Sequence, residues 1–192
     1  MISNRFKDRF SFLLTPLGER ISETGVSPNQ LTLLGMVLSI GAGVLIALGH
    51  LGWGALLVIV SGLCDALDGT IARNTQQVTR FGAFLDSTLD RYSDLALYLG
   101  IMTLAFTHQD LSLFLWTALA VTGAIMVSYT RARAECLIHQ CQVGIMERPE
   151  RIILLLIGLV FNWLEGAMVL TAILANITAL HRIYHTHRQL KE

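Results

Sequence analysis

The sequence predicts an all-α integral membrane protein, with six transmembrane helices preceded by an amphipathic helix that lies in the membrane interface. Hydrophobic residues make up 53% of the 192 residues, and the mean hydropathy is +0.57. A soluble domain of this length does not need so apolar a composition to build its core. Apolar runs close to the roughly 20 residues that a bilayer requires recur along the chain. We expect one domain over residues 1–192, with the interfacial helix in 1–25 and the six-helix bundle in 26–192.

The N-terminal 25 residues place apolar side chains at helical spacing. Phe6, Phe10 and Leu14 share one stripe, whereas Arg5 and Asp8 lie off it. A helix with this pattern rests its apolar face in the headgroup region instead of crossing the bilayer. No apolar core of a signal peptide precedes it, so we expect the chain to keep its N-terminus.

The apolar segments that follow are each predicted to cross the membrane. They cover residues 31–49, 53–73, 83–105, 111–133, 151–165 and 167–184, the fifth being short. Lys and Arg gather in the other connections and the tail, whereas the connections 49–52, 106–111 and 162–165 contain none. By the positive-inside rule, both termini and the long loops face the cytoplasm. The sequence therefore predicts a multi-pass protein of the cell membrane with a cytoplasmic active site.

The charge of the chain is balanced in total but uneven in space. The sequence has 14 Lys and Arg against 14 Asp and Glu, for a formal net charge of zero. Because the basic residues gather on the predicted cytoplasmic side, that face suits anionic headgroups or phosphorylated substrates. Nucleic acid is not an expected partner.

Four aspartates interrupt otherwise apolar segments. Asp65 and Asp68 are three residues apart, and Asp86 and Asp90 are four apart, so each pair shares one face of its own helix. An uncompensated carboxylate in a membrane helix costs roughly 2.5–3.5 kcal/mol even on the insertion scale, so a cation is expected to share the site. Carboxylate ligands without His or Cys favour Mg²⁺, Mn²⁺ or Ca²⁺. The pattern predicts a divalent-metal site near the membrane surface.

Neighbouring residues suit a phosphate ligand. Asp65 precedes Arg73 by eight residues and Asp90 follows Gly82 by eight, so both lie about 12 Å into their helices. In an antiparallel pair of helices, Asp65 is therefore expected to face Asp90, and Asp68 to face Asp86. Gly69 and Gly82 lack a Cβ and let a bulky ligand or a neighbouring helix approach the backbone. Arg73 offers a planar fork to a phosphate. Together with the metal, these residues indicate a centre that handles a phosphoanhydride.

This spacing resembles the signature of the CDP-alcohol phosphatidyltransferases, D-x-x-D-G-x-x-A-R-(x8)-G-x-x-x-D-x-x-x-D. Every fixed position is present: Asp65, Asp68, Gly69, Ala72, Arg73, Gly82, Asp86 and Asp90. The resemblance implies a six-helix homodimer, a Mg²⁺ or Mn²⁺ cofactor, and CDP-diacylglycerol or CDP-archaeol as donor. It also implies that Asp65, Asp68 and Asp86 are metal ligands, while Asp90 both neighbours the metal and acts as general base.

The same resemblance implies which residues contact the CDP-lipid. They are Thr32, Asp68, Gly69, Ala72, Arg73, Thr79 and Gly82. Helix capping or back-bonding explains the presence of Thr32 and Thr79 equally well, and Ala72 is most simply a packing position. In the expected reaction, Asp90 takes the proton of an acceptor hydroxyl, the hydroxyl oxygen attacks the phosphorus that bears the lipid alkoxide, and CMP departs.

Arginines in the segments 128–135 and 144–152 bear on the acceptor. These segments resemble the inositol-phosphate branch of the family, which implies that Arg131, Arg151 and Arg182 grip the phosphate of 1-L-myo-inositol 1-phosphate. Charge at the ends of membrane spans also arises from topology alone, so the residues themselves leave both interpretations open.

Two alternatives to this function stay open. The same chemistry could use glycerol 3-phosphate or serine as acceptor. A divalent-cation transporter is a more distant alternative, because its intramembrane acids usually lie near the midplane on repeated, broken helices, and the sequence has no internal repeat. Asp94 continues the stripe of Asp86 and Asp90, where it could bind an acceptor hydroxyl or simply pair with a neighbour.

Overall fold

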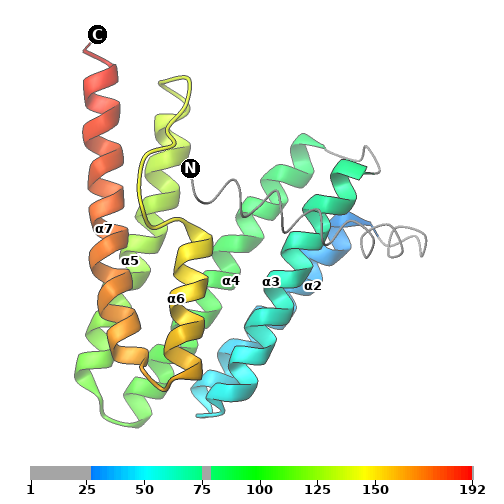
Figure 1. The fold of residues 1–192 in the computed structure, drawn as a ribbon, viewed down its shortest axis with the longest axis vertical. Helices are drawn as coiled ribbons and strands as arrows, with labels where there is room; N and C mark the ends of the chain where they lie inside the picture. Colours follow the sequence, from blue (N-terminus) through cyan, green and yellow to red (C-terminus); the bar gives the residue numbers. More distant parts are fainter. Residues whose placement is uncertain (1–26, 75–78, 192) are drawn as a thin grey trace. The chain divides into compact units, whose positions relative to one another are not determined.

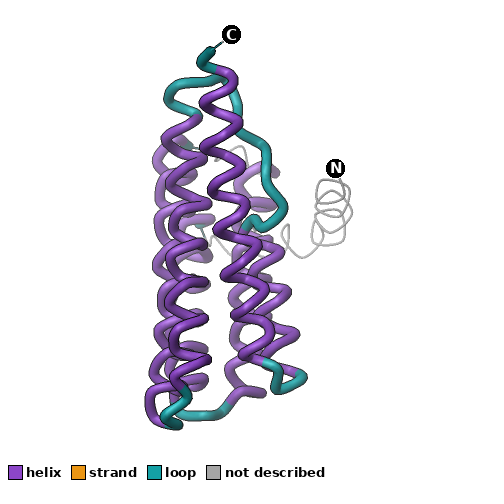
Figure 2. The backbone as a smooth tube through the Cα atoms, turned by 90° about the vertical axis from the view of Figure 1, so that its left-hand side faces the viewer, coloured by secondary structure: helices purple, strands orange, loops and turns teal. Residues whose placement is uncertain are grey.

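The computed structural model describes residues 27–74 and 79–191, and within these residues the fold is helical with no strand (Figures 1 and 2). The helices are α2 (Pro28–Ala47), α3 (Leu51–Asn74), α4 (Arg80–Thr107), α5 (Leu111–Ala134), α6 (Arg148–Val160) and α7 (Leu164–Gln189). The all-α prediction is therefore confirmed for the described chain. The predicted interfacial helix in 1–25 lies outside the described residues.

Each predicted span corresponds to a helix, but the helices differ in their suitability for a membrane. Among the described residues, α2, α3, α5 and α7 are long and apolar enough to cross a bilayer. Helix α4 has 28 residues and carries Asp86, Asp90, Arg91 and Asp94 between its start and its middle. Helix α6 has 13 residues, which gives a length of about 20 Å against a hydrocarbon core of about 30 Å. That all six cross the membrane stays a prediction.

Local hydrogen bonding explains where α2 begins. Ser27 precedes the helix, its N–H donates to Gln30 Oε1 at 2.9 Å, and Gln30 N–H donates to Ser27 Oγ at 3.4 Å. This reciprocal pair is a capping box, and Pro28 takes the first helical position, where its missing N–H is no loss. The helix therefore starts three residues before the predicted span.

Three helix ends correct the predicted boundaries. Gly49, Gln109 and Asn162 have φ of 81°, 56° and 52° and follow α2, α4 and α6. In each case the next residue donates its N–H back into the last helical turn, from His50 to Leu45 O, from Asp110 to Ala105 O and from Trp163 to Gly158 O. These are Schellman motifs. The predicted spans 31–49 and 151–165 ran into these turns, because apolar composition does not reveal a left-handed residue.

The described residues group into two compact units. The first comprises residues 27–42 and 56–96 without 75–78, and the second comprises 43–55 and 97–191. In the first unit, Leu31, Leu67 and Ile71 form a buried cluster between α2 and α3. The hydroxyls of Ser39 and Ser61 lie 2.8 Å apart and join the same two helices.

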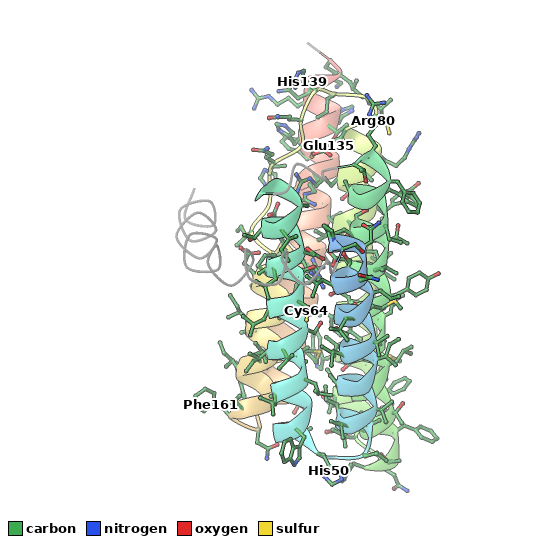
Figure 3. The ribbon with its side chains drawn as sticks, turned by 90° about the vertical axis from the view of Figure 1, so that its right-hand side faces the viewer. His50, Cys64, Arg80, Glu135, His139 and Phe161 are labelled. Atoms are coloured by element: carbon green, nitrogen blue, oxygen red, sulfur yellow. The ribbon has the colours of Figure 1, made fainter. Side chains whose placement is uncertain are left out.

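In the second unit, α5 and α7 pack along each other and α6 packs against α7 (Figures 1 and 2). A buried cluster of Val127, Met146, Ala175 and Ala179 joins α5, α7 and the segment before α6. Figure 3 shows His50 and Phe161, in the turns after α2 and α6, toward one end of this unit, and Glu135 and His139, just after α5, toward the other. The connection between α5 and α6 therefore lies opposite the short turns.

Candidate metal centre and acceptor site

Helices α3 and α4 bring three aspartates together in the first unit. Asp65, Asp68 and Asp86 each offer one carboxylate oxygen, and these oxygens all lie within 4.8 Å of one another. Asp68 is 6% exposed, and the other two are half-buried. Carboxylates at this separation repel one another strongly away from bulk water. A hard divalent cation removes that repulsion and prefers oxygen ligands, so the arrangement fits such an ion.

Asp90 follows this group of three along α4. It lies one turn after Asp86 on α4, and its Oδ2 is 3.6 Å from Nη2 of Arg91. Both side chains are partly exposed. The spacing argument placed Asp68 opposite Asp86, and the structure brings these two together. The roles of Asp90 as metal neighbour and general base stay predictions.

Thr32 connects α2 to the metal centre. Its hydroxyl donates to Asp68 Oδ2 at 2.6 Å, and the carbonyl oxygen of Pro28 lies at 3.1 Å. The back-bonding expected of a helical threonine is therefore present, but the shorter contact is with the carboxylate. A hydrogen bond to a metal-binding carboxylate holds it in orientation.

The start of α4 is built around a close approach to α2. Thr79 Oγ accepts the N–H of Gly82 at 2.9 Å, so Thr79 caps the helix as the simpler alternative predicted. A Cβ on Gly82 would lie 3.0 Å from that same oxygen and 3.4 Å from Oδ1 of Asn29. A side chain here would therefore press on the Thr79 hydroxyl, which would have to shift by a few tenths of an ångström. Sequence reasoning missed Asn29, which carries no motif of its own.

The remaining predicted donor contacts lie on α3 near the aspartates. Gly69 and Ala72 are half-buried, and Arg73 belongs to the last turns of the helix. Gly69 directly follows the buried Asp68. Their contact with a CDP-lipid stays a prediction.

The second unit holds the predicted acceptor arginines, and Arg182 is the most buried of them. It is 1% exposed, and three of its nitrogens donate: Nε to Val143 O at 2.8 Å, Nη1 to Val127 O at 2.6 Å and Nη2 to Glu147 Oε1 at 3.1 Å. These contacts join α7 to α5 and to the segment before α6. Arg182 therefore holds α7, α5 and the segment before α6 together, and it is also a candidate to bind the acceptor's phosphate.

Arg131 reaches the same carboxylate from α5. Its Nη1 lies 3.5 Å from Glu147 Oε1, and its Nε donates to Glu135 Oε1 at 3.0 Å. Arg151 is 2% exposed and lies one turn into α6, where its backbone N–H donates to Glu147 O at 3.3 Å. The structure thus brings Arg131 and Arg182 together at Glu147, with Arg151 following on the next turn.

The segment before α6 is anchored on α7. Thr178 Oγ accepts the N–H groups of Ile145 and Met146 at 3.3 and 3.1 Å. Gly144 has φ of 127°, and a Cβ there would collide with the methyl group of Thr178. This anchoring presents Glu147 to the two arginines. Sequence reasoning missed Glu147, because an acid among basic residues looks like ordinary surface charge.

Comparison with known proteins identifies the family. The profile described as CDP-alcohol phosphatidyltransferase matches residues 25–183. This chain belongs to that family. It is 38% identical over 194 residues to an archaetidylinositol phosphate synthase of Methanothermobacter thermautotrophicus, covering 98% of this chain and 95% of that protein. The family predicted from the resemblance to its signature is thereby confirmed.

Solved structures agree in fold as well as in sequence. The phosphatidylinositol phosphate synthase of Mycobacterium tuberculosis with CDP-DAG bound superposes with a TM-score of 0.83 at 34% identity, covering 90% of this chain and 92% of that one. The same enzyme in complex with manganese and citrate gives 0.84 at 33% identity, with coverage of 90% and 88%. The chain is therefore a CDP-alcohol phosphatidyltransferase, an enzyme of phospholipid synthesis. The transporter alternative is left without support.

Proposed function

We propose that this CDP-alcohol phosphatidyltransferase transfers the phosphatidyl or archaetidyl group of a CDP-linked lipid to a hydroxyl of 1-L-myo-inositol 1-phosphate and releases CMP. The observation that carries the choice of acceptor is the convergence of Arg131 and Arg182 on one carboxylate, Glu147. Two guanidinium groups that meet at one anion suit a phosphate monoester, which presents several charged oxygens. The names of the similar archaeal and mycobacterial enzymes support the same choice.

On the donor side, Asp65, Asp68 and Asp86 would hold Mg²⁺ or Mn²⁺, with Thr32 keeping the Asp68 carboxylate in place. When bound, a divalent cation supplies charge neutralisation for the diphosphate of the donor. Residues on α2, α3 and the start of α4 would line the CDP-lipid, namely Thr32, Asp68, Gly69, Ala72, Arg73, Thr79 and Gly82. The manganese and the CDP-DAG bound to the mycobacterial relative support this division of roles.

In the proposed transfer, the carboxylate of Asp90 accepts the proton of the acceptor hydroxyl. The hydroxyl oxygen then forms a bond to the phosphorus that bears the lipid alkoxide. The phosphoanhydride bond of the donor breaks, and its electron pair leaves with the oxygen of CMP. Arg131, Arg151 and Arg182 would hold the acceptor's phosphate and so restrict the orientation of the acceptor's ring.

An acceptor panel tests this proposal. Protein purified in detergent would be given CDP-diacylglycerol or CDP-archaeol, Mg²⁺, and one of four acceptors: inositol 1-phosphate, free inositol, glycerol 3-phosphate or serine. Lipid products would be identified by mass spectrometry. We expect transfer to inositol 1-phosphate and little to free inositol, because without its phosphate the arginines gain no partner. Efficient transfer to serine or glycerol 3-phosphate instead would overturn the choice of acceptor and leave the enzyme class intact.

We also propose that all six helices α2–α7 cross the cell membrane of a homodimer, with both termini and the active site on the cytoplasmic side. The connection between α5 and α6 is flanked by Arg131, Arg133 and Arg148, whereas the three Schellman turns contain neither Lys nor Arg. This asymmetry follows the positive-inside rule. A short α6 is compatible with crossing where the bilayer thins or where flanking arginines extend to the interface.

A further inference from the structure

We propose that Glu147 is a specificity-determining residue of the acceptor site. Its carboxylate holds Arg131 and Arg182 together in place of the acceptor's phosphate, and it gives them up when that phosphate binds. The identity of the displacing ligand rests on the proposed function. The displacement itself rests on the geometry around Glu147.

One carboxylate oxygen serves both arginines. Glu147 Oε1 accepts from Nη2 of Arg182 at 3.1 Å and lies 3.5 Å from Nη1 of Arg131. The carbonyl oxygens of Val127 and Val143 hold the other nitrogens of Arg182, so its guanidinium cannot turn to follow a ligand. An incoming anion must therefore come to the position that the Glu147 carboxylate occupies.

The surroundings of Glu147 favour displacement of its carboxylate from Arg131 and Arg182. It is 31% exposed, and Arg131 beside it is 40% exposed, so water reaches both. Glu147 is the N-cap residue of α6, but within the described chain its side chain makes no capping hydrogen bond. A carboxylate released from the arginines at that position faces the positive end of the helix, which stabilises negative charge. Rotation of one side chain is enough to open the site.

Exchange of one anion for another keeps Arg182 paired. A guanidinium that is 1% exposed is strongly destabilised if it loses its counter-charge. A phosphate monoester carries about 1.5–2 negative charges near neutral pH and three acceptor oxygens, more than the carboxylate it would replace. A neutral or zwitterionic acceptor such as inositol or serine brings no comparable charge and leaves Glu147 in position. Glu147 therefore selects for acceptors whose negative charge is large enough to displace its carboxylate.

The decisive variant is Glu147→Gln, which keeps the size and one acceptor oxygen but removes the competing charge. We expect inorganic phosphate to bind about three- to thirtyfold more tightly, the range of a partly exposed charge-assisted contact. Binding would be measured by calorimetry on the full-length protein in detergent with chelator present, so that no metal-bound phosphate contributes. The KM for inositol 1-phosphate should fall in parallel, while the KM for the CDP-lipid stays unchanged.

Glu135→Gln is the matched control. Glu135 also pairs with Arg131, at 3.0 Å, but belongs to the exposed end of α5 and has no contact with Arg182 among the described hydrogen bonds and ion pairs. Its neutralisation should change phosphate affinity by less than about twofold. If the two variants tighten phosphate equally, the effect is one of overall charge and the proposal is wrong.

Two further outcomes are informative. Weaker phosphate binding in Glu147→Gln would show that Glu147 orients the arginines for the ligand, and this too would overturn the proposal. If that variant does not fold, Glu147→Asp keeps the charge next to Arg182 while withdrawing the carboxylate by one methylene, and phosphate affinity should still rise. Because phosphate binding is measured without substrates, tighter binding together with transfer to glycerol 3-phosphate would reject the proposed acceptor and retain the inference, whereas efficient transfer to serine would overturn both.

Discussion

Replacing Thr32 by valine removes the hydroxyl that donates to Asp68 Oδ2 at 2.6 Å and changes the side-chain volume little. Because Asp68 is 6% exposed, water cannot readily take over this hydrogen bond. A hydrogen bond to a charged group contributes about 1.5–3 kcal/mol, which corresponds to about ten- to a hundredfold in affinity. We expect the Mg²⁺ or Mn²⁺ concentration that gives half-maximal transfer to rise by that factor.

The assay is a metal titration of CMP release at saturating donor and acceptor. At saturating metal the rate of Thr32→Val should return to near the wild-type value, because the ligands themselves remain. Thr32→Ser should behave like the wild type, since it restores the hydroxyl. Thr117→Val is a control for loss of a buried threonine hydroxyl, as Thr117 donates to Leu113 O within α5 at 2.6 Å. An unchanged titration in Thr32→Val, or an equal shift in Thr117→Val, would show that the Thr32 hydroxyl does not support metal binding.

Four further changes probe the metal, the base, the acceptor and the topology. Asp68→Asn removes one charged ligand from the cluster and should reduce transfer at least about a hundredfold at any metal concentration, and near-normal turnover would contradict the metal assignment. Asp90→Asn should lower kcat by about 10²–10⁴ with the CDP-lipid KM unchanged, whereas a collapse of donor binding would make Asp90 chiefly a ligand. Arg131→Gln should raise the KM for inositol 1-phosphate about tenfold and leave the donor KM unchanged, and an effect on the donor alone would reject the acceptor role. Cys136 is exposed, while the other two cysteines are buried. A membrane-impermeant maleimide should therefore label the wild-type protein in inverted vesicles and should not label Cys136→Ser. Labelling only in right-side-out vesicles would show that the topology is the reverse of the one proposed.

Much of the donor site could be predicted because it depends on local periodicity. Two aspartates three or four residues apart share a helix face whatever the helix packs against, and an acid in an apolar segment demands a cation. The pairing of Asp68 with Asp86 followed from equal depth on two consecutive helices, and the structure brings them together. Asp90 also meets the spacing rule and lies 3.6 Å from Arg91, and its place at the metal stays a prediction.

The helix ends and the supporting contacts could not be predicted in the same way. The boundaries after α2 and α6 depend on single left-handed residues, Gly49 and Asn162, which hydropathy does not detect. The acceptor side depends on how the connection between α5 and α6 lies on α7, and no periodic pattern encodes the path of an irregular segment. Glu147 therefore looked like one more surface charge until its position beside Arg131 and Arg182 was known.

Hydropathy and helical spacing predicted the helical membrane class and the residues of the acidic cluster, because both act over a few turns of one chain segment. The resemblance of the aspartate motif to a known signature predicted the family. Which side chains support the cluster depends on tertiary packing. Thr32 meets Asp68 across 36 positions, and Arg182 meets Glu147 across 35. Contacts between residues so far apart in the chain depend on the packing and rotation of whole helices, and that information is spread over every residue in the interface.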